Sequence, residues 1–338
     1  MAWRVRKTAA ESGREALTVN KALCVAIALV LGAFVADPAR SQDYPQKPVR
    51  IIVGFAAGSV SDLVARAIGQ KLTAALGQPF IVEVRPGAGS NVAAQYVARA
   101  PRDGYTLFVT TSSSTIRSPN ANPGFDFGSD FAPIALMAEV PFVVTAYPGL
   151  GVKTLKDFIA LAKAKPQALT FGGTAVGTTG HLAAQLFNQR AGTDIPIAPY
   201  PSTVQATADL MAGRISIAFA SAANVLELID AGKLTALAVA LPKRSRMMAQ
   251  LPSIDEAGLP GVYASLWIGI LAPTSTPGPI VNALSKAVNQ ALQSDDIVNQ
   301  LRLQGMEVLG GSPEEFAARI KSDTAQWDAV LQAAQLGK

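Results

Sequence analysis

Three short segments of this sequence combine glycine, small side chains and hydroxyls in a pattern that could bind a small anion. They comprise residues 54–62 (GFAAGSVSD), 110–115 (TTSSST) and 172–181 (GGTAVGTTGH), and each follows a predicted strand. Small residues let a ligand approach backbone N–H groups, and a helix that follows such a loop favours negative charge at its N-terminus. The chemistry indicated is binding of an anion by neutral donors.

Each segment also has a purely structural interpretation. Glycine serves tight turns, and serine and threonine cap helices without touching a ligand. Asp62 is expected to cap or orient the start of a helix, since a general-base role for it has no partner. His181 is the only histidine of the chain and is expected to be a structural residue at a helix start. The binding interpretation rests on the recurrence of the pattern in three loops.

Signatures of enzymes are weak throughout the sequence. A single histidine excludes a histidine metal cluster, and no phosphate-binding loop of the Walker type, nucleophile elbow or cysteine pair is present. Gly87-Ala88-Gly89 could begin a dinucleotide fingerprint, but Val92 stands where the third glycine belongs. The basic run 243–246 (KRSR) is typical of a solvated loop, with docking of a partner as the alternative. We expect no enzymatic activity, no cofactor and no metal.

The elements that must position these loops alternate between strand and helix, which indicates α/β architecture with parallel sheets. In the first half, strands are predicted at 49–53, 80–84 and 105–110, and helices at 63–76 and 91–100. The same order restarts with strands at 169–171, 215–219 and 235–240, and helices at 155–165, 181–191, 204–212 and 224–231. A Thr154/Asp157 capping box opens the helix at 155.

Two apolar segments, 141–148 and 266–271, are predicted to be crossings between two lobes. The first lobe would then comprise residues 42–143 and 266–338, completed by helices at 280–293 and 313–335, and the second lobe residues 144–265. The ligand cleft would lie between the lobes, because ligands of open α/β sheets bind beyond the carboxyl ends of the strands.

The N-terminus predicts export. Basic residues precede an uncharged apolar run of 15 residues at 22–36, which is shorter than the roughly 20 residues that a membrane-spanning helix needs. Small side chains at Ala39 and Ser41 favour cleavage before Gln42, so residues 1–41 are interpreted as a signal peptide and the mature protein as periplasmic.

Removal of this segment changes the composition. Residues 1–41 carry six Lys/Arg and three Asp/Glu, so the formal charge falls from +5 to +2, and they contain the only cysteine, Cys24. The low residual charge argues against nucleic acid as a partner. The mature chain would have no disulfides, and its length allows a core large enough to stabilise it alone.

Over essentially its whole mature length, the chain resembles the Bug-type periplasmic solute-binding receptors of tripartite tricarboxylate transporters. The landmarks are Tyr44-Pro45, Pro48-Val49-Arg50, Gly58, Asp62, 83–89 (EVRPGAG), 103–107 (DGYTL), 130–134 (DFAPI), Gly177-Thr178, 181–183 (HLA), Pro199-Tyr200, 231–234 (AGKL), 256–261 (EAGLPG), Trp267 and 313–316 (PEEF).

The resemblance implies a type II periplasmic-binding-protein fold of two lobes that closes on a small carboxylate. One carboxylate group would be held by backbone groups and waters at Phe55, Ala56, Ala57 and Gly58. The second and third loops would hold the remainder of the ligand through Thr111, Ser112, Ser113, Gly177, Thr178 and Thr179. The predicted site further includes Ser59, Asp62, His181, Tyr200, Ala220 and Ser221. It contains no obligatory arginine and would rely on oriented dipoles.

This chain departs from many relatives around the implied pocket. They carry Asp after the strand at 215–219, where this chain has Ala220-Ser221. They often carry His-Val where it has Ile197-Ala198, and Lys-Gly where it has Pro201-Ser202. The wall is thus less charged, and we expect an aromatic or short aliphatic monocarboxylate in preference to citrate or aspartate.

The predicted function is capture of a small organic carboxylate by lobe closure and its delivery to a membrane permease. An alternative is a periplasmic sensor subunit whose closed form docks on a signalling partner. A hydrolase or transferase on the same fold is disfavoured, because nothing supplies an activated nucleophile. We expect a monomer.

Overall fold

The computed structural model describes residues 44–116, 124–165, 168–173, 178–200 and 203–333. It divides into two units, residues 1–46 and 47–338, and the fold below is that of the second unit. The predicted signal peptide, residues 1–41, lies outside the described residues. Within the described ranges, no helix has both the length and the hydropathy needed to cross a membrane.

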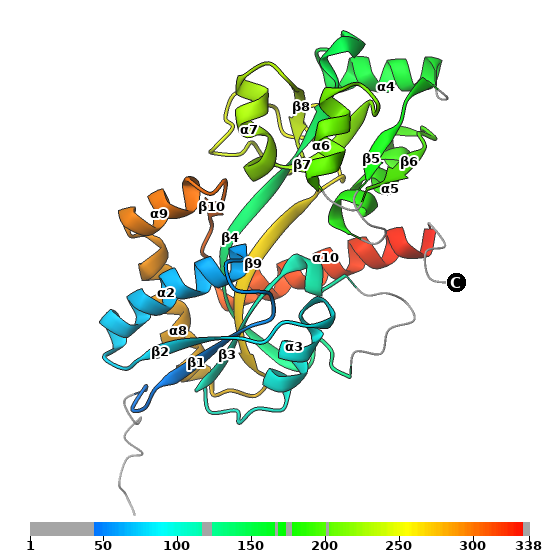
Figure 1. Cartoon of the computed structure of the whole chain (residues 1–338). Coiled ribbons are helices and arrows are strands. Elements are labelled where there is room, and N and C mark those ends of the chain that lie inside the picture. The colour runs from blue at the N-terminus through cyan, green and yellow to red at the C-terminus, as the bar shows by residue number, and fades with distance from the viewer. Residues whose placement is uncertain (1–43, 117–123, 166–167, 174–177, 201–202, 334–338) are drawn as a thin grey trace, which may run out of the picture. The chain divides into compact units, whose positions relative to one another are not determined.

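In the described ranges, ten strands form one mixed sheet with the order β2-β1-β3-β9-β4-β7-β5-β6, and β8 and β10 pair with β4 (Figure 1). The strands are β1 (Val49–Val53), β2 (Phe80–Val84), β3 (Thr106–Thr111), β4 (Phe131–Ala146), β5 (Phe171–Gly173), β6 (Ile197–Pro199), β7 (Ile217–Ser221), β8 (Thr235–Val239), β9 (Ser265–Pro273) and β10 (Glu307–Val308).

The helices follow the predicted order with small changes of boundary. They are α2 (Val60–Leu76), α3 (Asn91–Ala98), α4 (Leu155–Ala164), α5 (Thr179–Ala191), α6 (Thr203–Met211), α7 (Ala222–Asp230), α8 (Gly278–Leu292), α9 (Asp295–Arg302) and α10 (Pro313–Ala333). The sequence interpretation had not included α9, β6 or β10. It also started the crossing strand at 141, ten residues after β4 begins, because the prolines at 141 and 148 bound the predicted segment.

The parallel pairing predicted from the alternation of strand and helix is present at both ends of the sheet. β1 pairs in parallel with β2 and β3, and β5 pairs in parallel with β6 and β7. Every pairing that involves β4 or β9 is antiparallel. Each of the two parallel groups therefore has loops at the carboxyl ends of its strands, as expected. Antiparallel strands lie between the two groups.

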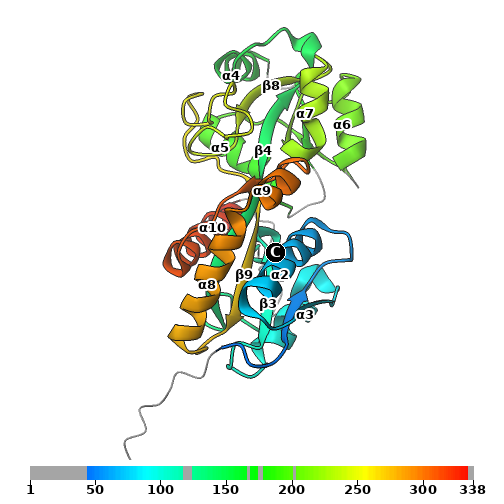
Figure 2. The ribbon, with the colours of Figure 1, turned by 90° about the vertical axis from the view of Figure 1, so that its left-hand side faces the viewer.

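The long strand β4 changes partners near its middle. Residues 131–141 pair with β9, whereas residues 142–146 pair with β7 and with β8. Both views show β4 and β9 side by side along the stretch between the two parallel groups (Figures 1 and 2). This change of partner lies next to the predicted lobe boundary at 143/144, which itself stays a prediction.

Local sequence signals account for the helices nearest the candidate loops. In α2, Ser59 is the N-cap and accepts a hydrogen bond from the Asp62 N–H, and Gly77 ends the helix with a φ of 71°. In α4, the predicted capping box of Thr154 and Asp157 is present, with both reciprocal hydrogen bonds.

Aromatic side chains pack against one another in two of the hydrophobic clusters. One cluster gathers Phe residues on β3, β4 and the segment before it, together with Trp267 and Phe316, whose rings meet edge to face at 5.2 Å. Gly269 on β9 is required there, because a Cβ atom at this position would lie 2.1 Å from the Phe316 ring. The other cluster packs the Phe rings of α4, α5, β5 and β7: Phe158, Phe171, Phe187 and Phe219.

A largely buried charged network joins β4, β9 and α10. Arg319 Nη2 donates to Glu139 Oε1 at 2.7 Å and to Ser265 Oγ at 2.8 Å, and Arg319 Nε lies 3.0 Å from Asp323 Oδ1. The Trp267 indole N–H donates to Asp323 Oδ2 at 2.7 Å. Burial raises the pKa of Asp323 above its ordinary value. The network fixes α10 against the two long strands.

Candidate ligand-binding site

The first loop, residues 54–59, connects β1 to α2 and is shaped by Asp62. Asp62 is buried in the first turn of α2, and its Oδ2 accepts a hydrogen bond from the Gly58 N–H at 2.9 Å. Its Oδ1 lies 2.9 Å from Arg66 Nε. The carboxylate thus holds the loop against the helix start, in agreement with the orienting role predicted for it.

Three backbone N–H groups of this loop are left for a ligand. The N–H groups of Gly58 and Ser59 are used by Asp62 and by the Ala56 carbonyl. In the part of the chain that the structure describes, the N–H groups of Phe55, Ala56 and Ala57 make no hydrogen bond. Ala56 and Ala57 are exposed. An exposed run of free donors ahead of a 17-residue helix suits an anion.

Ser90 lies against this loop and had not been singled out from the sequence. A Cβ atom on Gly54 would lie 1.7 Å from the Ser90 hydroxyl, so the two backbones approach closely and only glycine fits. Ser90 has a φ of 82°, in the left-handed region, and its buried Oγ has no hydrogen-bond partner among the described residues. Strain and an unsatisfied buried hydroxyl often mark functional positions. Neither feature can be seen in the sequence.

The second loop follows β3, and most of its hydroxyls have structural partners. Thr110 Oγ1 donates to Ser114 Oγ at 2.8 Å, Thr115 Oγ1 donates to the Ser112 carbonyl at 2.8 Å, and Ser112 Oγ donates to the Ser265 carbonyl on β9 at 3.1 Å. Buried residues among them are Thr110, Ser112, Ser114 and Thr115. Most hydroxyl groups of this loop therefore have a structural role.

Thr111 and Ser113 form the remaining pair, with their hydroxyl oxygens 2.6 Å apart. Ser113 is exposed, whereas Thr111 is buried. Because one hydroxyl of such a pair donates to the other, the second keeps its proton for a further acceptor. Of the predicted residues in this loop, Ser113 is the one best placed to donate to a ligand.

The third loop is only partly described. Gly177 lies outside the described residues, together with 174–176. Thr178 is the N-cap of α5 and accepts a hydrogen bond from the His181 N–H, while Thr179 and His181 are buried. Burial lowers the pKa of His181, so the imidazole is neutral at neutral pH. This geometry agrees with the structural helix-start role expected for His181.

The three other predicted residues lie at the ends of β6 and β7. The Tyr200 hydroxyl donates to Asp209 Oδ2 at 2.8 Å, and its backbone N–H donates to the Gly173 carbonyl. Ala220 and Ser221 end β7, and Ser221 is the N-cap of α7 without a side-chain capping bond. The Tyr200 hydroxyl is thus used in a hydrogen bond within the protein, and the Tyr200 backbone is held at the end of β5.

The structure gathers the predicted residues into two groups. The first and second loops follow β1 and β3, which are adjacent and parallel with Val53 opposite Val109, so both loops leave the same edge. The residues 178–181, 200 and 220–221 follow β5, β6 and β7, which form the other parallel group. Among the described residues, no set of three or more His, Cys, Asp or Glu side chains could hold a metal ion.

The chain matches a known family over most of its length. Residues 64–336 match the family described as tripartite tricarboxylate transporter family receptor. The chain belongs to this family. The resemblance inferred from the sequence landmarks is thereby confirmed, and members of the family are periplasmic solute-binding receptors.

Individual relatives agree with this assignment. BugT of Bordetella pertussis is 31% identical over 319 residues, which cover 94% of this chain and 98% of the relative. The structure of R. palustris Rpa4515 with adipate is 34% identical, covers 86% of this chain and 98% of its own, and has a TM-score of 0.67. MatC from Rhodopseudomonas palustris with bound malate is 29% identical, with a TM-score of 0.64 and coverage of 85% and 100%.

These similarities confirm the predicted fold class, the α/β periplasmic-binding-protein fold. They also show that relatives of this chain bind small carboxylates, since adipate and malate occupy two of the similar structures. The individual ligand contacts predicted for this chain remain predictions.

Proposed function

We propose that this protein is a periplasmic receptor that binds a small organic carboxylate at the loop 54–59 and delivers it to a membrane permease. The observation that carries the proposal is the set of free N–H groups at Phe55, Ala56 and Ala57, ahead of α2. Neutral oriented dipoles stabilise a carboxylate without an arginine. Ser113 and Ser90 add hydroxyls from the neighbouring segments.

The proposal includes the lobe arrangement and the mode of action. Residues 42–143 and 266–338 form one lobe and residues 144–265 the other, and closure of the lobes would bring Thr178, Thr179 and the segments at 200 and 220–221 onto the bound acid. The protein would act without catalysis, as a monomer.

The ligand we propose is an acid of low polarity, such as an aromatic or short aliphatic monocarboxylate. Ala220 and Ser221 end β7 where many relatives carry Asp, and Ile197-Ala198 on β6 stands where they often carry His-Val. A thermal-shift series with benzoate, butyrate, adipate, malate and citrate tests this. An acid at 100 times its Kd stabilises by about 2.7 kcal/mol. Stabilisation by di- or tricarboxylates alone would reject the low-polarity ligand.

A matched pair of variants tests the position of the carboxylate. Ala57→Asp places a negative charge beside the free N–H groups, whereas Ala57→Asn adds nearly the same volume without charge, at an exposed residue. We expect Ala57→Asp to weaken binding of the acid at least about tenfold and Ala57→Asn to weaken it much less. Equal effects of the two variants would place the carboxylate elsewhere.

Export is tested separately. We propose that residues 1–41 are removed after secretion, with cleavage near Ser41. Mass spectrometry of the protein released from the periplasm should give a chain that begins at or near Gln42. A chain of full mass in that fraction would contradict cleavage.

A further inference from the structure

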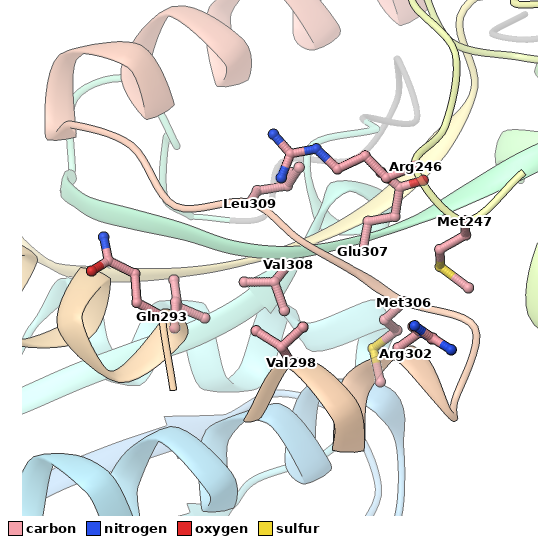
Figure 3. A pocket seen from close by; sticks show the side chains of 10 residues that line it. Arg246, Met247, Gln293, Val298, Arg302, Met306, Glu307, Val308 and Leu309 are labelled. Atoms are coloured by element: carbon pink, nitrogen blue, oxygen red, sulfur yellow. The ribbon is translucent and has the colours of Figure 1, made fainter. Parts of the chain in front are cut away.

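A cavity distant in sequence from the candidate loops lies between the loop after β8 and the segment formed by α9 and β10 (Figure 3). Its volume is about 680 Å³, within the range of about 300–1,000 Å³ that is common for ligand pockets. Its lining includes Arg246, Met247, Val298, Arg302, Met306 and Glu307.

The two walls of this cavity are held together by a specific polar contact. Ser245 is buried, and its hydroxyl donates to the Glu307 carboxylate on β10 while it accepts hydrogen bonds from the N–H groups of Met247 and Met248. β10 is itself paired to β4 through Glu307 and Val308. The cavity is therefore preformed by secondary structure on one side and by a serine-capped turn on the other.

The charges around the cavity favour an anion. Arg246 and Arg302 come from opposite walls, and Glu307 is the only acidic residue of the lining. The neighbouring Arg244 pairs with Glu256 at 2.8 Å, but neither Arg246 nor Arg302 lies within ion-pair distance of a carboxylate among the described residues. Two guanidinium groups against one carboxylate leave a formal excess of one positive charge.

The remaining surface of the cavity is apolar. Val298 and Val308 face one another in the close-up, Met306 lies beside Arg302, and Met247 lies on the wall that carries Arg246 (Figure 3). Val298 is 37% exposed and Leu309 39% exposed, so both offer apolar surface to a ligand in the cavity. Flexible methionine side chains suit ligands of varied shape.

We propose that this cavity is a second binding site that takes an amphipathic monoanion, a carboxylate carried on an alkyl or aryl body. The carboxylate binds the guanidinium of Arg302, which lies next to Met306 (Figure 3), and Arg246 adds positive charge from the opposite wall. The Val and Met side chains cover the apolar body. The site is separate from the loops proposed to bind the transported acid, and its two walls belong to the two proposed lobes.

Methyl resonances of methionine provide a local test. The protein labelled with ¹³C at its methionine methyl groups is titrated with octanoate, and in parallel with octanol and octylamine. We expect octanoate to shift the resonances of Met247 and Met306 and not that of Met211 on α6, and the neutral and cationic compounds to bind at least about tenfold more weakly. Met211 lies outside the cavity lining.

Variants establish which groups bind the anion. Arg302→Gln should raise the octanoate Kd about fivefold and Arg246→Gln should raise it less. Lys243→Gln, which removes the same charge from an exposed neighbour outside the lining, should change the Kd less than about twofold. Equal binding of octanol, an unchanged Kd in both arginine variants, or shifts confined to methyl groups outside the cavity would overturn the proposal. Binding of the transported acid should be unaltered in both arginine variants, so failure here leaves the proposed function standing.

Discussion

Replacement of Arg319 by methionine should destabilise the protein because two carboxylates lose their cation. Glu139 and Asp323 keep only 6% and 18% of their side-chain surface exposed, while Arg319 keeps 30%. Removal of one partner from a buried ion pair costs about 3–5 kcal/mol, and the partial exposure of Arg319 favours the lower figure. Methionine fills much of the volume of arginine, so the loss reports mainly on charge.

The expected shift of the melting temperature follows from the size of the unit. Unfolding entropy of about 2.1 cal/mol/K per residue over about 290 residues gives roughly 0.6 kcal/mol per degree, so a loss of about 3 kcal/mol lowers the Tm by about 5 °C. Differential scanning calorimetry measures this. Arg244→Met is the control, since the Arg244–Glu256 pair is about half exposed on both sides and should contribute at most about 1 kcal/mol.

The loss of stability in Arg319→Met should also depend on pH. Burial raises the pKa of Asp323 in the folded state, so its protonated form stabilises the fold, and this stabilisation disappears as the pH rises through the folded-state pKa. Without Arg319, Asp323 takes up a proton more readily, because attraction to the Arg319 charge no longer lowers its pKa. The difference in Tm between Arg319→Met and the parent protein should therefore shrink from pH 7 toward pH 5. A loss equal to that of Arg244→Met, or a loss that is the same at both pH values, would refute the reasoning.

Three further predictions concern the candidate loops. Asp62→Ala removes the acceptor of the Gly58 N–H and should weaken binding of the transported acid about tenfold in calorimetric titration, with about 1 kcal/mol lost in stability; unchanged affinity would contradict the orienting role. Gly54→Ala should lower the Tm because its Cβ meets the Ser90 hydroxyl, and Gly54→Ala combined with Ser90→Gly should recover most of that loss; no recovery would point to another cause. Ser112→Ala should cost about 1 kcal/mol in chemical denaturation and Ser113→Ala less than half of that, while only Ser113→Ala should weaken ligand binding directly; the reverse order would exchange their roles.

The sequence alone determined the order of elements and the position of the candidate loops. Strand and helix differ in the spacing of apolar residues, and caps such as Ser59 and Thr154 act over three or four residues, so both signals are local. β2 was predicted with the boundaries it has, and most helices within a few residues. The three-residue β6 carries too little periodicity to be recognised.

The tertiary structure decided how the strands pair and which polar groups are free. The hydroxyls at 110–115 are alike in the sequence, but Ser112 is taken up by a carbonyl of β9, 153 residues away, and Ser113 remains exposed. Glu139 and Arg319 are 180 residues apart and meet only because α10 packs on β4. Contacts of this kind depend on sheet order and side-chain packing, which no local pattern encodes, and they determine which donors remain for a ligand.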